Sequence, residues 1–298
     1  MKVVFLISDY VLHNHIISEY VAARPQDEVA VVKVPLVLKG KGRGSTAKRI
    51  VPQLSRRFAW GKALEFLTLT AITWTPKILS RGATFRRLRQ TARLHGLPFL
   101  RVDDVMCEES LSFIREHGAD VVVSLFHQIL RAPLIAIPRL GVVNVHPGLL
   151  PEFRGIQPYF WELSEGSERA GATLHLIEDE RIDAGGILAQ ASYRTFPGMS
   201  VQLNYYLTSK VASSLLPRCL GALEEGRLQP RAQSADEGAY WRWPDSAAFT
   251  RLKERGYPLI GWRQLFGVLA GHQDEFEAES ESLAMDGECR SGDGRESP

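Results

Sequence analysis

The chain has 298 residues, of which 45% are hydrophobic and 23% are charged, the proportions of an ordinary globular protein. Its three cysteines form no CxxC pair, which disfavours a disulfide framework or a structural zinc site, and its longest apolar stretch, residues 63–75, is shorter than the ~20 residues of a membrane span. The separate cysteines lead us to expect a reduced, cytoplasmic protein. The net charge of +2 combines a basic stretch at residues 33–101 with an acidic one at residues 272–298.

The first elements along the chain predict an α/β fold. Residues 2–8 are apolar, β-branched and uninterrupted, as in a buried parallel strand. Apolar residues then recur at helical spacing over 11–23, and residues 28–34 form a second strand-like run. This β–α–β opening is typical of an open, mainly parallel sheet of Rossmann-like form.

The same alternation resumes after a basic and apolar insertion at 35–97, which contains a glycine-rich run, an aromatic stretch and a basic helix at 83–94. The elements predicted beyond it are strand 98–102, helix 108–117 closed by Gly118, strands 119–125 and 141–146, helix 157–163, strands 171–177 and 187–194, and helix 201–223. Residues 1–226 are therefore expected to form one catalytic domain, followed by a small C-terminal extension at 227–271 and an acidic, disordered tail at 272–298.

Polar residues end the predicted strand 141–146, where open α/β sheets bind their ligands. Asn144 and His146 are two residues apart on this strand and therefore point to the same side. Asp183 follows in a glycine-rich loop, and glycine lets the backbone approach a ligand closely. We predict that these three side chains form one site.

Acyl transfer to an amine needs few groups. A hydrogen-bond donor must face the oxyanion of the tetrahedral intermediate, and a base must take the proton of the amine. The amide of Asn144 can donate, His146 titrates near neutrality, and Asp183 can stabilise the imidazolium and order a water molecule. No metal and no covalent nucleophile is required.

These motifs resemble the folate-dependent formyltransferase family, which includes glycinamide ribonucleotide, methionyl-tRNA and sugar N-formyltransferases. The matching segments are Asn144-Val-His146, Gly148-Leu-Leu-Pro-Glu-Phe-Arg-Gly155 and Asp183-Ala-Gly185. Several motifs in the right order are far more specific than one alone. One departure is Gly148, where many members have serine, and some sugar-modifying members also have glycine there.

The resemblance implies a formyl transfer from 10-formyltetrahydrofolate, with His146 as general base, Asn144 as oxyanion donor and Asp183 as proton relay. It also implies the residues that would bind the pterin of the donor, which are Phe126, His127, Gln128, Ile129, Leu130, Ile177, Glu178 and Asp179. The loop expected to contact the acceptor contains Leu149, Leu150, Pro151, Arg154 and Gly155.

Four further residues can be explained by a purely structural role. His175 lies in strand-like sequence and is interpreted as structural, and Trp241 and Trp243 are interpreted as packing residues. Arg154 either binds a phosphate or braces its loop.

The acceptor is predicted by exclusion to be an amino sugar, linked to a nucleotide or to a lipid. Methionyl-tRNA formyltransferases carry a C-terminal barrel domain of about 100 residues, whereas the segment after residue 226 has no clear run of strands. The alternatives are a methionyl-tRNA formyltransferase-like enzyme, hydrolysis of the donor by the same residues, and a non-catalytic module that binds a glycan or RNA. The sequence predicts neither the oligomeric state nor the identity of the amine.

The basic stretch at 33–101 contains sixteen Lys or Arg residues and one acidic residue, a net charge of +15. It is interpreted as a solvated surface insertion, as a surface for a phosphate-bearing partner, or as a peripheral membrane contact through residues 58–94. For the partner we favour a small-molecule amine over nucleic acid.

Overall fold

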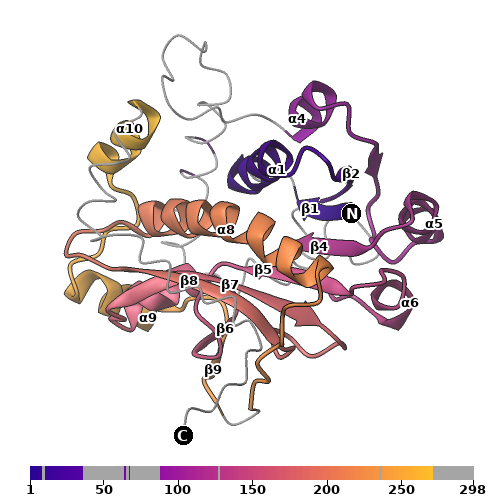
Figure 1. Ribbon diagram of the computed structural model, residues 1–298. Helices are drawn as coiled ribbons and strands as arrows, with labels where there is room; N and C mark the ends of the chain where they lie inside the picture. Colours follow the sequence, from indigo (N-terminus) through magenta and orange to yellow (C-terminus); the bar gives the residue numbers. More distant parts are fainter. Residues whose placement is uncertain are drawn as a thin grey trace, which may run out of the picture.

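A seven-stranded sheet organises the protein in the computed structural model, which describes residues 1–8, 11–35, 64, 67, 88–126, 128–234 and 237–270 (Figure 1). The strands, in the order of the sheet, are β3 (Phe99–Arg101), β2 (Glu28–Val34), β1 (Lys2–Ser8), β4 (Val121–Leu125), β5 (Val142–His146), β7 (Arg169–Ile177) and β8 (Ile187–Arg194). The helices are α1 (Val11–Ala23), α4 (Leu88–Leu94), α5 (Glu108–His117), α6 (Ala132–Ile135), α7 (Pro158–Ser164), α8 (Val201–Glu224), α9 (Ser246–Glu254) and α10 (Trp262–Ala270).

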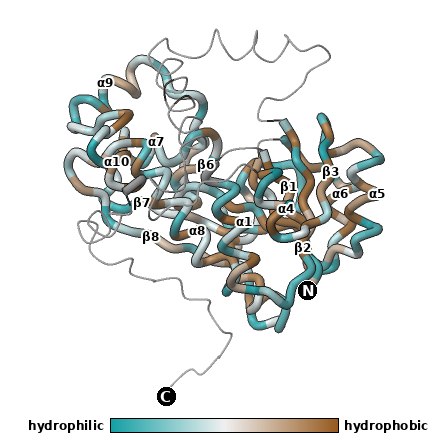
Figure 2. The backbone as a smooth tube through the Cα atoms, turned by 90° about the horizontal axis from the view of Figure 1, so that it is seen from above, coloured by the Kyte–Doolittle hydropathy of each residue, from teal (hydrophilic) through white to brown (hydrophobic). Residues whose placement is uncertain are grey.

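The first five strands of the sheet run parallel, as the sequence predicted. Alternate residues of each strand enter different cores because successive side chains point to opposite faces. On β1, Phe5 packs with residues of α1 and α8, whereas Leu6 packs with residues of α5 and α6. Figure 2 shows hydrophobic segments gathered around β1 and α6. Each fully buried side chain of this size stabilises the fold by about 1.5–3 kcal/mol.

Strand β7 runs antiparallel to β5, and β8 runs antiparallel to β7. A short loop, residues 178–186, joins them, and such a loop allows only an antiparallel return because a parallel strand needs a longer crossover. The register between β7 and β8 shifts at Leu174/His175, which marks a bulge in the ladder. The mainly parallel sheet therefore ends in an antiparallel edge.

The segment after residue 226 packs onto the rest of the chain. Strand β9 (Ala239–Trp241) pairs in parallel with β6 (Phe153–Gly155), on the side of the main sheet opposite α1 and α8 (Figure 1). The ring of Trp241 stacks on Trp161 with centroids 4.5 Å apart, and Arg231 pairs with Ile187 of β8. Both predicted packing residues, Trp241 and Trp243, lie against the core.

Several sequence predictions fall outside the described residues, namely the glycine-rich run 39–44, nearly all of the stretch 58–79, His127 and the tail 272–298. The predicted basic helix 83–94 is described from Leu88 onward, and Leu88 and Ala92 of this helix are buried. None of the helices in the described ranges has the length and hydropathy needed to cross a bilayer.

Candidate active site

The predicted catalytic residues come from one central strand and from the loop between the two edge strands. Asn144 and His146 lie on β5, whose intervening valines enter the core beneath α1 and α8, so both polar side chains point to the other face. Asp183 lies in loop 178–186 with φ of 50°, a left-handed conformation that few non-glycine residues adopt. Such backbone outliers concentrate at functional sites.

Asp183 is the group that the other site residues share. Its Oδ1 lies 3.5 Å from Nδ1 of His146 and accepts a hydrogen bond from Nδ2 of Asn144, also at 3.5 Å. Its Oδ2 accepts the backbone N–H of Gly155 at 2.8 Å. Burial alone would raise the pKa of this carboxyl, but the charge and N–H of His146 outweigh burial, with a smaller contribution from His175, and hold the pKa well below its ordinary value.

Both ring nitrogens of His146 face oxygen atoms. Nε2 donates to the backbone carbonyl of Phe153 at 2.7 Å, and Nδ1 faces the carboxylate of Asp183. Burial lowers the pKa of His146, but the charge of Asp183, the hydrogen bond to it and the Phe153 carbonyl together raise the pKa above 6.5. In the neutral ring, the Phe153 carbonyl keeps the proton on Nε2 and leaves Nδ1 as the nitrogen that accepts a proton.

His175 belongs to the same cluster, although the sequence suggested only a structural role. Its Nε2 lies 3.0 Å from Nδ2 of Asn144 and 3.5 Å from Oδ1 of Asp183. Its Nδ1 faces the carbonyl of Leu176 at 2.8 Å and therefore carries the proton. His175 then accepts from Asn144 and fixes the orientation of that amide.

A tight turn follows His146 and depends on glycine. A Cβ added to Gly148 would lie 2.4 Å from Cβ of Pro158, at the start of α7, so no side chain fits there. The departure from serine at this position therefore has a packing cause within this chain.

The loop after Gly148 is held to the edge strands through Thr173 and Gln190. The hydroxyl of Thr173 donates to the carbonyl of Gly148 at 2.7 Å and accepts the N–H of Leu150 at 3.1 Å. The amide of Gln190 donates to the carbonyl of Leu150 at 2.6 Å and to the Thr173 hydroxyl at 3.0 Å. These bonds fix the backbone that brings Phe153 to His146.

A buried carboxyl fixes the other side of the loop. Glu162 of α7 is 0% exposed, and its Oε1 accepts the N–H of Leu149 at 3.1 Å and of Gly171 at 3.3 Å. Its Oε2 accepts from Asn204 at 3.3 Å. Burial raises the pKa of Glu162 well above its ordinary range, although these three donors act in the opposite direction.

Arg154, which the sequence placed either on a phosphate or on its own loop, braces the loop here. Its Nε and Nη2 donate to Oε1 of Gln233, and its Nη2 also donates to the carbonyl of Ser234 at 3.0 Å. Gln233 in turn donates to the carbonyls of Asp183 at 3.1 Å and Gly185 at 2.6 Å. Arg154 and Gln233 thus support the backbone that carries the site carboxylate.

The residues predicted to bind the pterin fall into two groups. Phe126 and Leu130 are buried in the core that Ile177 also packs against, which brings three of them together. The other described ones face solvent or hold loops. Gln128 makes hydrogen bonds to the backbone of Asp103 and Val105, and Ile129 is 54% exposed. Glu178 accepts the N–H of Gly186, and Asp179 forms an ion pair with Arg181. The pterin contacts and the acceptor contacts of the loop stay predictions.

This cluster can move protons and orient a donor N–H. It supplies a base with one defined accepting nitrogen, a carboxylate that stabilises the protonated ring, and an amide beside them. Ligand atoms of His146, His175 and Asp183 also lie within 4.8 Å of one another, which is close enough for one metal ion. The amide N–H of Asn144, however, points at two of these three groups, where it would compete with an ion.

Four site groups were missed by reasoning from the sequence: His175, the Phe153 carbonyl, Glu162 and Gln233. For His175, the signal was its strand position opposite Asn144, which needs the antiparallel β5–β7 register to be known. The other three depend on contacts between distant segments.

Comparison with known proteins identifies relatives in sequence. A family model described as "Formyl transferase" matches residues 1–220. The methionyl-tRNA formyltransferase of Lachnospira eligens is 32% identical over 166 residues, which cover 55% of this chain and 52% of that protein. The corresponding enzyme of Caldanaerobacter subterraneus is 29% identical over 199 residues, covering 65% of this chain and 63% of that protein. The chain therefore spans about half to two thirds of the length of these curated relatives.

Solved structures share the fold at lower identity. A sugar N-formyltransferase from a Shewanella species has a TM-score of 0.53 at 19% identity, covering 86% of this chain and 88% of that chain. The N-formyltransferase of Helicobacter canadensis, solved with folinic acid and dTDP-3-aminofucose, has a TM-score of 0.52 at 13% identity, covering 88% and 85%.

Proposed function

Because this chain belongs to the formyl transferase family, we propose that it moves a formyl group from 10-formyltetrahydrofolate to the nitrogen of an amine. The observation that carries the proposal is the cluster of Asn144, His146 and Asp183, in which Oδ1 of Asp183 lies 3.5 Å from both Nδ1 of His146 and Nδ2 of Asn144. The reduced folate bound to the Helicobacter canadensis neighbour supports the choice of donor.

Each residue has a distinct task in this reaction. The amine attacks the formyl carbon, and the Asn144 N–H that otherwise makes the long, 3.5 Å bond to Asp183 is the donor for the oxygen that becomes negative, while the bond to His175 holds the amide in place. His146 takes the proton of the amine at Nδ1, because its Nε2 is committed to the carbonyl of Phe153, and Asp183 stabilises the imidazolium. The C–N bond to the folate then breaks, and the same proton passes to the departing nitrogen.

For the acceptor we favour an amino sugar. The sugar-modifying neighbours are matched over 85–88% of their length and over 86–88% of this chain. The matched region covers only 52% of the Lachnospira methionyl-tRNA enzyme. Methionyl-tRNA is the second candidate because the curated sequence relatives at 29–32% identity act on it by name.

The test measures tetrahydrofolate release with two acceptors, a nucleotide-linked amino sugar and methionyl-tRNA, and in a third reaction without any acceptor. We expect release with the amino sugar and its loss by about 100-fold or more in His146→Ala, as removal of a general base typically causes. His117→Ala, at the C-terminal end of α5, is the matched control.

Other outcomes assign the alternatives. Release with methionyl-tRNA alone selects the second candidate, and equal release without any acceptor means donor hydrolysis. If no tetrahydrofolate is released with any amine, the formyl-transfer proposal is contradicted, and the remaining alternative is a non-catalytic module that binds a glycan or RNA.

A further inference from the structure

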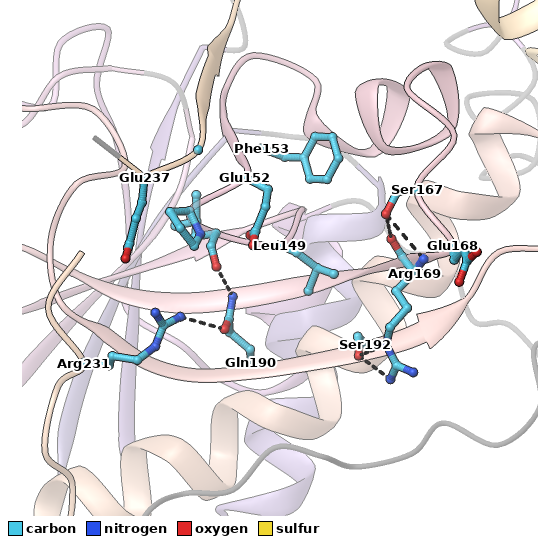
Figure 3. Close-up of a pocket in the computed structure, with 13 residues that line it drawn as sticks. Leu149, Glu152, Phe153, Ser167, Glu168, Arg169, Gln190, Ser192, Arg231 and Glu237 are labelled. Atoms are coloured by element: carbon cyan, nitrogen blue, oxygen red, sulfur yellow. Dashed lines mark hydrogen bonds between the residues drawn. The ribbon is translucent and has the colours of Figure 1, made fainter. Parts of the chain in front are cut away.

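A cavity of about 760 Å³ lies beside the candidate active site, and Asn144, His146, His175 and Asp183 do not line it. It shares with the site Phe153 and the loop residues Leu149, Leu150 and Pro151, which the sequence predicted to contact the acceptor. Its walls are the loop Leu149–Phe153 on one side and the edge strands β7 and β8 on the other (Figure 3). Thr173 is paired with both His146 and Gln190, so the backbone of Gln190, at the cavity floor, is two strand spacings, about 10 Å, from the backbone of His146.

Two arginines flank the floor of this cavity, one on each side of Gln190 (Figure 3). Nε and Nη2 of Arg169 donate to the hydroxyl of Ser192 at 3.0 and 2.6 Å, and Nη2 of Arg231 donates to Oε1 of Gln190 at 3.2 Å. Both guanidinium groups are thus oriented by neutral oxygens. Within the part of the chain that the structure describes, neither has a carboxylate within ion-pair distance.

The two anchoring side chains fix the spacing of the arginines. Gln190 and Ser192 are two residues apart on β8 and point to the same face, with Cα atoms about 7 Å apart. Each guanidinium keeps N–H groups that are not used in these bonds, and the planar guanidinium matches the geometry of a phosphate. The pair can therefore contact a phosphate and a neighbouring oxygen of one ligand.

The rest of the lining limits which phosphate compound fits. Glu152, Glu168 and Glu237 are exposed at the cavity and would repel a chain of phosphates. The same carboxylates, with Ser167, are acceptors for hydroxyl groups. The lining thus combines a cationic floor with acceptor groups, which suits a compound with a single phosphate and several hydroxyls.

We propose that this cavity is a second ligand site, distinct from the reacting centre, that binds a phosphorylated sugar. Arg169 and Arg231 hold the phosphate, and the carboxylates accept the sugar hydroxyls. Gln190, which orients Arg231, also holds the carbonyl of Leu150 at 2.6 Å. Binding in the cavity therefore acts on the loop whose Phe153 carbonyl contacts His146.

The test is calorimetric titration of the full chain with glucose 1-phosphate. We expect saturable binding that is weakened about tenfold or more in both Arg169→Gln and Arg231→Gln, because each variant loses charge-assisted hydrogen bonds to the phosphate. Arg139→Gln, which removes an exposed arginine paired with Asp120, is the matched control and should bind like the unmodified chain. His146→Ala should also bind with unchanged affinity.

Ser192→Ala, which keeps both charges but releases Arg169, provides a second variant with an expected intermediate affinity. Glucose and inorganic phosphate are the comparison probes, and each should bind more weakly than glucose 1-phosphate. The proposal is overturned if the full chain does not bind glucose 1-phosphate at millimolar concentration, if both arginine variants keep its affinity, or if His146→Ala abolishes binding. Inorganic phosphate binding as tightly as the sugar phosphate would overturn the assignment to a sugar.

Discussion

The two halves of the sheet differ in how they use their faces. Strands β3, β2, β1 and β4 run parallel, and nearly all of their central side chains are apolar and buried between helices. Strands β5, β7 and β8 present polar side chains on one face, where the site cluster and the cavity lie. The comparison indicates that the first half supplies stability and the second supplies chemistry, so substitutions in the two halves should affect different measurements.

The largest effect on stability is expected in the parallel half. Phe5 is 0% exposed, and Phe5→Ala should lower the free energy of unfolding by about 3–5 kcal/mol because it leaves a cavity in the core. Chemical denaturation measures this loss. The rate per folded molecule should stay unchanged. If Phe5→Ala lowers this rate as much as a substitution in the active site does, the two halves of the sheet do not have separate roles.

Two aspartates that both accept a backbone N–H at 2.8 Å sharpen the same comparison. Asp183 accepts from Gly155 in the second half, and Asp120 accepts from Lys2 in the first. Asp183→Ala should reduce kcat by about 100-fold or more, because the imidazolium loses its carboxylate. Asp120→Ala should leave kcat unchanged and cost about 1–3 kcal/mol of stability by denaturation.

Glu162 tests how the loop depends on its buried anchor. Glu162→Ala leaves the N–H groups of Leu149 and Gly171 without an acceptor, and each such loss costs about 1–3 kcal/mol. We expect lower stability and a lower kcat, with part of both recovered in Glu162→Gln, which keeps one acceptor. If Glu162→Gln loses as much activity as Glu162→Ala, the loop does not depend on these bonds.

The smallest expected effect is a shift in pH dependence. His146 acts as a base only when neutral, and its pKa in the folded protein lies above 6.5, so kcat/KM should rise with pH to a plateau reached above that value. Asp183→Asn removes the charge that raises this pKa, so the residual activity should rise at lower pH. An unchanged pH profile in Asp183→Asn would mean that Asp183 does not set the pKa of His146.

The same two groups both stabilise the fold, but their contributions depend on pH in opposite directions. The raised pKa of His146 stabilises the fold below pH 6.5, and this contribution is lost as pH rises through the folded value. The lowered pKa of Asp183 stabilises the fold above pH 3.8 and is lost as pH falls below it. Denaturation of His146→Ala and the unmodified chain across pH 5–9 measures the first contribution.

The sequence by itself determined most elements up to residue 226, and it singled out three central site residues. It did not predict α6, β6, β9, α9 and α10. Apolar periodicity placed β1, α1, β2, α5 and α8 almost to the residue, because periodicity is a local property of the chain. Asn144 and His146 could be predicted because they lie two residues apart on one strand. Asp183 could be predicted from its distance along the chain from His146 and from the glycines that follow it.

Only the tertiary structure decided which groups surround those three. His175 enters the site because β7 runs antiparallel to β5, a register that no local pattern specifies. The Phe153 carbonyl, Glu162 and Gln233 act through hydrogen bonds between segments that are distant in the sequence. The cavity floor likewise combines Arg169 and Arg231, which are 62 positions apart and meet only because Arg231 pairs with the edge strand β8.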